Sequence, residues 1–176
     1  IALGLVDELR GIIKDSEDPF ETGLRISLAG NIIDFGPATT VNERIIEEAI
    51  KKSLSQKLDS GKVELLKKEI KNAEKILFIG DNAGEIVLDK IFMENLPYEK
   101  ITYAVRGGPA LNDATIEDAK MVGMVDYVRV ITTGLDMPAA ILPLCSEEFV
   151  SEYKKSGLVI SKGQGNYEAL CEEDNN

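Results

Sequence analysis

The chain has 176 residues, enough for one domain with a sizeable core, and a second large domain is not expected. Its 20 Lys and Arg face 31 Asp and Glu, so the net charge of −11 argues against binding nucleic acid through the phosphate backbone. Histidine is absent, which excludes histidine-based catalytic triads and zinc sites built on imidazole.

Segments that would direct the chain to a membrane or out of the cell are not apparent. No apolar run approaches the roughly 20 residues that cross a bilayer. The sequence starts at Ile1 without a basic and apolar leader, so we expect an internal piece of a longer gene product. Cys145 and Cys171 have no C-x-x-C partner, which favours two reduced thiols. We therefore expect a soluble cytoplasmic protein.

The first part of the chain, residues 1–72, is predicted to be helical. Four stretches carry apolar residues at helical spacing. They are residues 5–13, Pro19–Leu28, the stretch after Asn42 that includes Ile50, and Val63–Ile70. Asp18 and Asn42 are suited to cap the second and third helices. The apolar faces of these helices need a partner, so we expect them to pack on the remainder of the chain.

From residue 73 onward the pattern changes to short apolar runs that alternate with amphipathic helices. The runs are Ile76–Ile79, Ile101–Val105, Tyr127–Ile131 and Leu158–Ile160, and the helices are Glu85–Glu94, Thr115–Val122 and Ser146–Tyr153. This alternation is typical of βαβ units with a parallel sheet, so the predicted fold class is α/β. Residues 1–72 and 73–176 are expected to form one structural domain.

Polar side chains follow the first two predicted strands. Asp81 and Asn82 come directly after the first strand in FIGDNAGE, and Asp113 ends the loop after the second, preceded by Asn112. Ligands of open parallel sheets bind at the carboxyl ends of the strands. Carboxylate and amide oxygens suit a hard divalent cation. The alternative is that each of these residues only caps the helix that follows it.

The loop after the last strand carries a lysine, two glycines and an asparagine. Lys162, Gly163, Gly165 and Asn166 could hold a phosphate through an ammonium and bare backbone N–H groups. A lysine in a solvated turn is the alternative. Asn31 and Asp34 are polar residues inside an apolar stretch, and helix termination explains them about as well as a functional site does.

Four strings occur along the chain in the order AGNIIDFG, FIGDNAGE, VRGGPALNDAT and ISKGQGNYEAL. They resemble those of the damage-control metal-dependent phosphatases, long known as domain of unknown function 89, in their prokaryotic and especially archaeal branch. The resemblance implies a three-layer α/β/α sandwich with a helical N-terminal part. It also implies that Asp81, Asn82 and Asp113 bind the metal, with Asp81 and Asp113 as the catalytic residues. Proteins of this family are longer at both ends.

The resemblance places a small phosphorylated metabolite beside Lys162, Gly163 and Asn166. Further residues are candidates for the pocket wall: Asn31, Glu85, Arg106, Asn112, Thr133 and Gly134. The predicted function is a phosphatase that uses Mn²⁺, Mg²⁺, Co²⁺ or Ni²⁺ to hydrolyse phosphate monoesters such as sugar phosphates, with no nucleic-acid or membrane partner. A binder of phosphorylated metabolites without turnover, and a scaffold with purely structural loops, are the alternatives. The sequence leaves open whether water or Asp81 attacks phosphorus.

Overall fold

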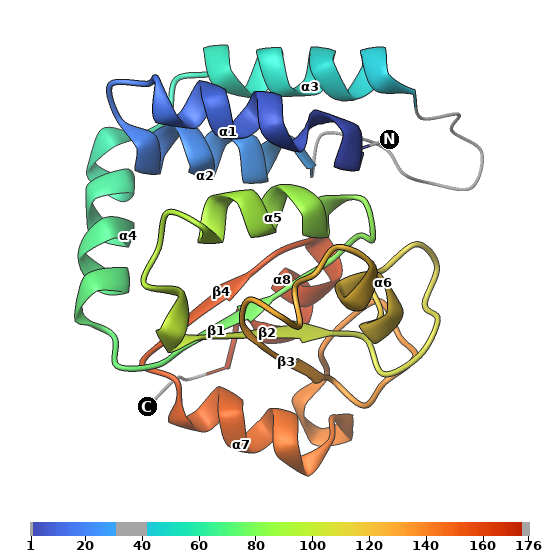
Figure 1. Cartoon of the computed structure of the whole chain (residues 1–176). Coiled ribbons are helices and arrows are strands. Elements are labelled where there is room, and N and C mark those ends of the chain that lie inside the picture. Colours follow the sequence, from blue (N-terminus) through green and yellow to red (C-terminus); the bar gives the residue numbers. More distant parts are fainter. Residues whose placement is uncertain (1, 31–41, 174–176) are drawn as a thin grey trace.

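A computed structural model describes residues 2–30 and 42–173 (Figure 1). The 3₁₀ turns are η1 (Ala2–Leu5), η2 (Tyr98–Lys100) and η3 (Leu142–Leu144). The helices before the first strand are α1 (Val6–Lys14), α2 (Pro19–Gly30), α3 (Glu43–Ser55) and α4 (Ser60–Asn72). The later helices are α5 (Glu85–Met93), α6 (Ile116–Met121), α7 (Glu147–Lys155) and α8 (Gln164–Leu170). The strands are β1 (Ile76–Ile79), β2 (Ile101–Val105), β3 (Arg129–Thr132) and β4 (Leu158–Ser161).

The four strands form one parallel sheet in the order β3-β2-β1-β4. Ile76 is in register with both Ile101 and Leu158, so β1 lies between β2 and β4. Every residue of β1 and β2 is buried, which explains why these strands read as continuous apolar runs. The predicted parallel α/β sheet is confirmed, and all four strands end at the same edge.

Alternate residues of β1 point to opposite faces of the sheet. Ile76 and Phe78 belong to the larger apolar cluster, which includes residues of α1, α2 and α5. Leu77 and Ile79 belong to a smaller cluster with residues of α7 and α8. Figure 1 accordingly shows α5 on one side of the sheet, with α1, α2 and α3 beyond it, and α7 on the other side. The predicted α/β/α layers are therefore present, with an additional helical layer.

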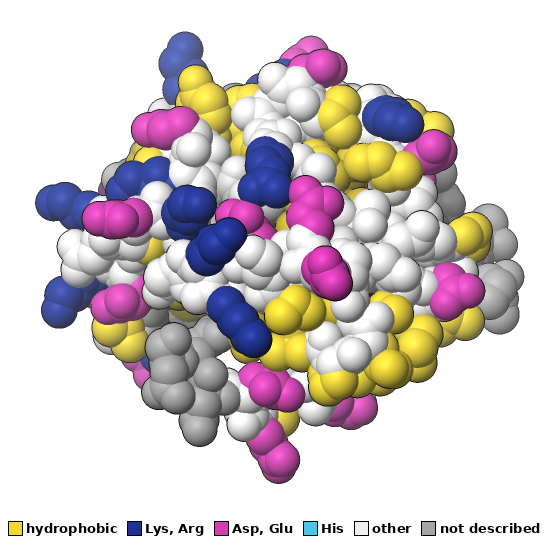
Figure 2. Space-filling model, turned by 90° about the horizontal axis from the view of Figure 1, so that it is seen from below, with side chains coloured by type: hydrophobic (Ala, Val, Ile, Leu, Met, Phe, Trp, Pro, Cys, Tyr) yellow, Lys and Arg dark blue, Asp and Glu magenta, His cyan; other side chains and the backbone are white. Residues whose placement is uncertain are grey.

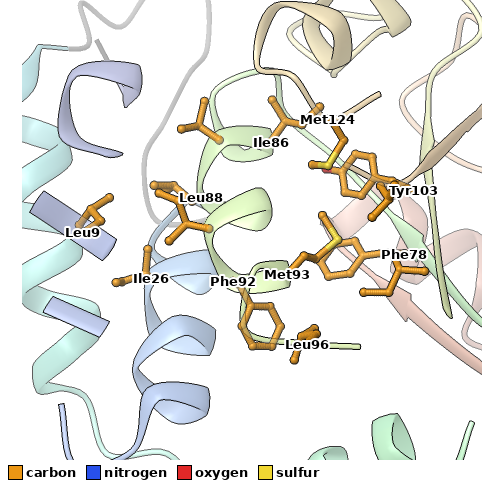
Figure 3. Packing of buried hydrophobic residues seen from close by; sticks show 14 of the residues in the cluster. Leu9, Ile26, Phe78, Ile86, Leu88, Phe92, Met93, Leu96, Tyr103 and Met124 are labelled. Carbon is orange, nitrogen blue, oxygen red and sulfur yellow. The ribbon is translucent and has the colours of Figure 1, made fainter. Parts of the chain in front are cut away.

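Helix α5 is enclosed between the sheet and the N-terminal helices. In Figure 3, Leu88 of α5 lies towards Leu9 and Ile26, while Met93 lies towards Phe78 of the sheet. Eight of the nine residues of α5 are buried, and six of these are apolar, so this helix needs partners around most of its circumference. The larger apolar cluster therefore runs continuously from α1 to the sheet. The division at residue 73 stays a prediction.

Local signals predicted most element starts. Asp18 Oδ1 accepts a hydrogen bond from Glu21 N at 3.0 Å, and Asn42 Oδ1 accepts one from Ile45 N at 3.1 Å, so both predicted caps are confirmed. Strand β3 begins two residues later than predicted, because the amides of Tyr127 and Val128 both donate to Met124 O in a turn.

Helix α8 is the main departure from the prediction, which treated Gly165 and Asn166 as loop residues. Gly165 lies in the first turn, where an added Cβ would collide with Pro138 O. The sequence QGNYEAL has a glycine near its start and little apolar periodicity, so contacts with the loop at Pro138 fix this helix more than local propensity does.

Candidate functional site

The loops after β1 and β2 pair with each other through their backbones. Asn82 and Asp113 form an isolated antiparallel bridge. Ala83 N donates to Asn112 O at 2.9 Å, and Ala114 N donates to Asp81 O at 2.7 Å. The two loops that were predicted to form the metal site therefore lie side by side.

Helix capping does not explain Asp81, Asn82 or Asp113. The N-cap residue of α5 is Gly84, which makes no side-chain cap. The N-cap residue of α6 is Thr115, whose backbone N–H donates to Asp118 Oδ2 at 2.8 Å in a capping box. The capping alternative for these residues is therefore wrong, and another reason is needed for polar groups at both strand ends.

Arg106 connects three of the strand-end loops. Its Nε donates to Asp113 Oδ2 at 2.6 Å, and its Nη1 donates to Asn166 Oδ1 at 2.9 Å. Its Nη2 lies 3.7 Å from Asp81 Oδ1. Only 1% of the Arg106 side chain is exposed, so these ionic contacts are made away from water. Asp81 and Asp113 therefore face the same guanidinium.

Burial raises the pKa of Asp81 to about 6, and the nearby carboxylates of Asp113 and Glu85 act in the same direction. Arg106 and Lys162 oppose this shift without cancelling it. The charged form of Asp81 is therefore disfavoured by burial and by neighbouring carboxylates, in spite of the two nearby cations.

Asn82 is held in a defined orientation by its neighbours. Its Nδ2 donates to Asp81 Oδ2 at 2.9 Å and to Glu85 Oε1 at 3.1 Å. Its Oδ1 accepts from Asn112 Nδ2. The amide oxygen of Asn82 therefore points towards the loop that carries Asp113, on the side where the predicted ligands gather.

Lys162 is buried and does not lie in a solvated turn. Its Nζ donates to Ser27 O at 3.0 Å, to Ser27 Oγ at 3.2 Å and to Asp89 Oδ1 at 2.9 Å. Glu85 Oε2 lies 3.0 Å from the same Nζ as an ion pair, outside hydrogen-bonding geometry. Burial alone would lower the pKa of Lys162, but Asp89 and Glu85 outweigh it and raise that pKa. The ammonium is thus already committed to partners within the protein.

Sequence reasoning missed the partners of Lys162. Asp89 is fully buried, and besides Lys162 it accepts hydrogen bonds from Ser27 Oγ at 2.6 Å and from Tyr103 OH at 2.9 Å. One signal was available, because Asp89 follows Glu85 by four residues on a helix whose other residues, apart from Lys90, are apolar. That spacing puts both carboxylates on one helix face.

Asn166 and Gly163 have structural roles that the loop prediction did not include. Asn166 Oδ1 accepts from Arg106 and Ala140, and its Nδ2 donates to Gly80 O and Lys162 O, so its side-chain amide is fully used. Gly163 has φ +85°, and a Cβ there would overlap the carboxylate of Asp81. Their contact with a phosphate stays a prediction.

The remaining pocket-wall candidates are distributed as follows. Thr133 is buried, its N donates to Val105 O at 2.8 Å, and its Oγ1 accepts from Leu135 N at 3.2 Å, which fixes the turn that includes Gly134. Glu85, Arg106 and Asn112 lie in the network described above. Asn31 lies outside the described residues. Binding roles for all six stay predictions.

The donor set and the charge of the site fit a divalent cation. Four carboxylates, those of Asp81, Glu85, Asp89 and Asp113, share the network with two cations, Arg106 and Lys162, which leaves two negative charges. Glu85 Oε2 and Arg106 Nη2 are buried without a hydrogen-bond partner among the described residues. No group of three or more acidic, cysteine or histidine side chains in residues 2–30 and 42–173 is arranged to hold a metal. The predicted ligand set does not form such a group, because it has two carboxylates and one amide oxygen.

The opposite edge of the sheet carries different features. A hollow of about 570 Å³ lies at the amino ends of the strands, lined by residues that include Lys75, Thr102 and Arg129. Figure 2 shows another surface, the α7 side of the sheet, where Lys and Arg side chains have Asp and Glu among them, without a broad region of one sign. No helix in the described part of the chain is long and apolar enough to cross a membrane. The predicted site lies at the carboxyl ends of the strands, away from this hollow. The predicted partners stay predictions.

Comparison with known proteins adds independent information. A family model described as "Damage-control phosphatase ARMT1-like domain" matches residues 1–176. The protein MJ0202 of Methanocaldococcus jannaschii is 43% identical over 179 residues, which cover 98% of this chain and 58% of that protein. Damage-control phosphatase PH1575 of Pyrococcus horikoshii is 37% identical over 156 residues, which cover 87% of this chain and 54% of that protein.

A third relative, a damage-control phosphatase of Archaeoglobus fulgidus, is 32% identical over 167 residues, which cover 92% of this chain and 57% of that protein. The crystal structure of the domain-of-unknown-function-89 protein PH1575 superimposes with a TM-score of 0.82 at 35% identity, covering 98% of this chain and 61% of that one. The chain therefore spans less than two thirds of the length of each of these relatives.

Proposed function

The chain belongs to the damage-control phosphatase ARMT1-like domain family, and we propose that it forms the metal- and phosphate-binding part of a phosphatase. The proposed reaction is hydrolysis of phosphate monoesters of small metabolites, such as sugar phosphates. The proposed cofactor is a divalent ion, Mn²⁺, Mg²⁺, Co²⁺ or Ni²⁺. Two relatives carry the name damage-control phosphatase, which supports the reaction class.

One observation within this chain carries the proposal. Asp81 and Asp113 follow neighbouring parallel strands and sit on backbone-paired loops. Through Asn82 they join Glu85, Asp89, Arg106 and Lys162 in a network that has two more negative than positive charges. A buried excess of negative charge is costly unless a cation compensates it. A divalent cation would supply the missing charge, and oxygen ligands are the ones that such ions prefer.

Each residue has a proposed role that follows from its contacts. Asp81, Asn82 and Asp113 would hold the ion, which when bound polarises the phosphorus and offsets charge on the phosphoryl oxygens. Asn112 orients the amide of Asn82, and Glu85 receives the second donor bond of that amide. Backbone N–H groups near Gly163 would face the phosphate. Lys162 was predicted to bind the phosphate itself; because its ammonium is engaged with Ser27, Asp89 and Glu85, its proposed role is instead to hold Glu85 in place.

The experiment that tests this proposal is a phosphatase assay with and without added metal. The purified protein should hydrolyse p-nitrophenyl phosphate when Mn²⁺, Co²⁺ or Ni²⁺ is added and lose that activity with a chelator. A screen of sugar phosphates, nucleotides and phosphopantetheine would then identify the substrate class. Asp81→Ala should abolish the metal-dependent activity with the fold intact, as judged by circular dichroism.

A matched control makes the assay specific. Asp126 is exposed at the opposite edge of the sheet, so Asp126→Ala removes the same charge without touching the site. Its activity should equal that of the unaltered protein. Metal binding without turnover would favour the non-enzymatic binder, and absence of metal binding would favour a scaffold.

A further inference from the structure

Arg106 is the best-shielded cation next to the proposed metal ligands. It is 1% exposed, and its Nε donates to Asp113 Oδ2 at 2.6 Å. Its Nη2 makes no hydrogen bond to a described residue and lies 3.7 Å from Asp81 Oδ1. One guanidinium therefore neutralises one proposed ligand directly and faces the other.

Each of the two carboxylates keeps one oxygen that accepts no hydrogen bond from the described residues. Asp113 Oδ2 is taken by Arg106, and no hydrogen bond from the described residues reaches Asp113 Oδ1. Asp81 Oδ2 accepts from Asn82, and Asp81 Oδ1 has only the 3.7 Å ion-pair contact with Arg106. Any cation held by both Asp81 and Asp113 would have a fixed positive charge beside it.

The guanidinium is not able to swing away without breaking a second network. Its Nη1 is bound to Asn166 Oδ1, and Asn166 is itself bound to Ala140 N, Gly80 O and Lys162 O. Arginine does not lose its proton in proteins. The positive charge therefore stays in place when a metal ion enters.

From this arrangement we infer that Arg106 is the internal counter-ion of the metal site. In the metal-free protein it compensates Asp113 and keeps the strand-end loops together. When a divalent cation binds, the same charge repels it and weakens its affinity, so that the ion exchanges more readily. This inference rests on the proposed metal site and assigns Arg106 as a positioning residue that sets metal affinity.

The opposite role is physically distinct and predicts the opposite sign. If Arg106 mainly orients Asp113 for the metal, as the outer partners of metal ligands often do, its loss should weaken metal binding roughly 10–100-fold. If Arg106 is a counter-ion, its loss removes the repulsion between its charge and the metal ion. Its loss also leaves a buried carboxylate uncompensated, and metal binding supplies the missing positive charge. Its loss should then tighten metal binding.

The test compares Arg106→Gln with the unaltered protein. Isothermal titration with Mn²⁺ should give binding that is tighter on the order of tenfold or more in the variant. The metal-free variant should have a lower Tm, and Mn²⁺ should raise that Tm by more than it raises the Tm of the unaltered protein, because an ion that binds the folded state stabilises it in proportion to its affinity.

Arg129→Gln is the matched control. Arg129 pairs with Glu148 and Glu152, and its position on β3 puts it at the start of a strand, away from the carboxyl edge. It removes the same unit of charge, and Mn²⁺ affinity should change by less than about twofold because distant exposed charges are screened.

Each result decides the matter. Weaker or unchanged Mn²⁺ binding by Arg106→Gln overturns the inference while leaving the proposed function standing. Failure of the unaltered protein to bind Mn²⁺ overturns both. If Arg106→Gln is unfolded without metal, refolding is carried out in millimolar Mn²⁺: recovery of the folded protein supports the counter-ion role, and failure to recover it counts against that role.

Discussion

Lys162 offers the sharpest test of how burial changes the meaning of a residue. A lysine whose ammonium only binds the phosphate would affect KM and leave stability unchanged, and a lysine in a solvated turn would affect neither. The structure instead surrounds its Nζ with Asp89, Glu85 and Ser27, with 8% of the side chain exposed. We expect Lys162→Met, which keeps much of the volume and removes the charge, to act first on stability.

The magnitude follows from what the substitution leaves behind. Asp89 and Glu85 are fully buried, and without the ammonium their charges lack a partner. Removal of one member of a buried ion pair costs about 3–5 kcal/mol, a large share of the roughly 5–15 kcal/mol that stabilises a typical domain. Urea unfolding at pH 7, followed by circular dichroism, should show this as a lower midpoint without a change in slope.

A matched variant separates this effect from loss of charge in general. Lys154 is exposed on α7 with no ion pair among the described residues, so Lys154→Met should change stability by less than about 0.5 kcal/mol. Asp89→Asn combined with Lys162→Met should recover part of the loss, since it removes one uncompensated charge. An unfolding midpoint for Lys162→Met equal to that of the unaltered protein would refute the assignment of this lysine to a buried ion-pair network.

Three further predictions concern single positions. Burial raises the pKa of Asp81 to about 6, so the folded protein favours the protonated carboxyl. The stabilisation from this protonated form is fully present below the unfolded pKa of roughly 4 and is lost as pH rises through 6. Asp81→Asn should therefore stabilise the metal-free protein at pH 7 by about 1–3 kcal/mol in urea unfolding and remove the rise in Tm caused by Mn²⁺; destabilisation would contradict this. Gly163→Ala should cost about 1–3 kcal/mol and weaken Mn²⁺ binding measured by titration, because φ is +85° and the new Cβ meets Asp81, whereas Gly11→Ala, in an open helical position, should gain about 0.5–1 kcal/mol. Leu111 has φ +53° and is 85% exposed, so Leu111→Asn should raise the urea midpoint by an amount equivalent to about 0.5–1 kcal/mol, and a fall would show that its side chain is needed.

The sequence by itself determined those features that depend on neighbouring residues. Runs such as Ile76–Ile79 and Ile101–Val105 are buried on both faces of a parallel sheet, so their apolar character is continuous and their bounds were predicted without error. Caps such as Asn42 act through hydrogen bonds to residues three positions away. Because parallel strands end at one edge, the meeting of the Asp81 and Asp113 loops also followed from the order of elements.

Tertiary structure alone decided which polar residues are exposed and which are paired. Lys162 meets Ser27 across 135 residues of sequence, and Arg106 meets Asn166 across 60. A lysine has the same local pattern in a solvated turn and in a buried ion pair, so no short-range signal distinguishes the two. The difference arises because the packing of α5 on the sheet, and of α2 on α5, removes water from these groups. A charge without water must find a partner from whichever element folding brings beside it.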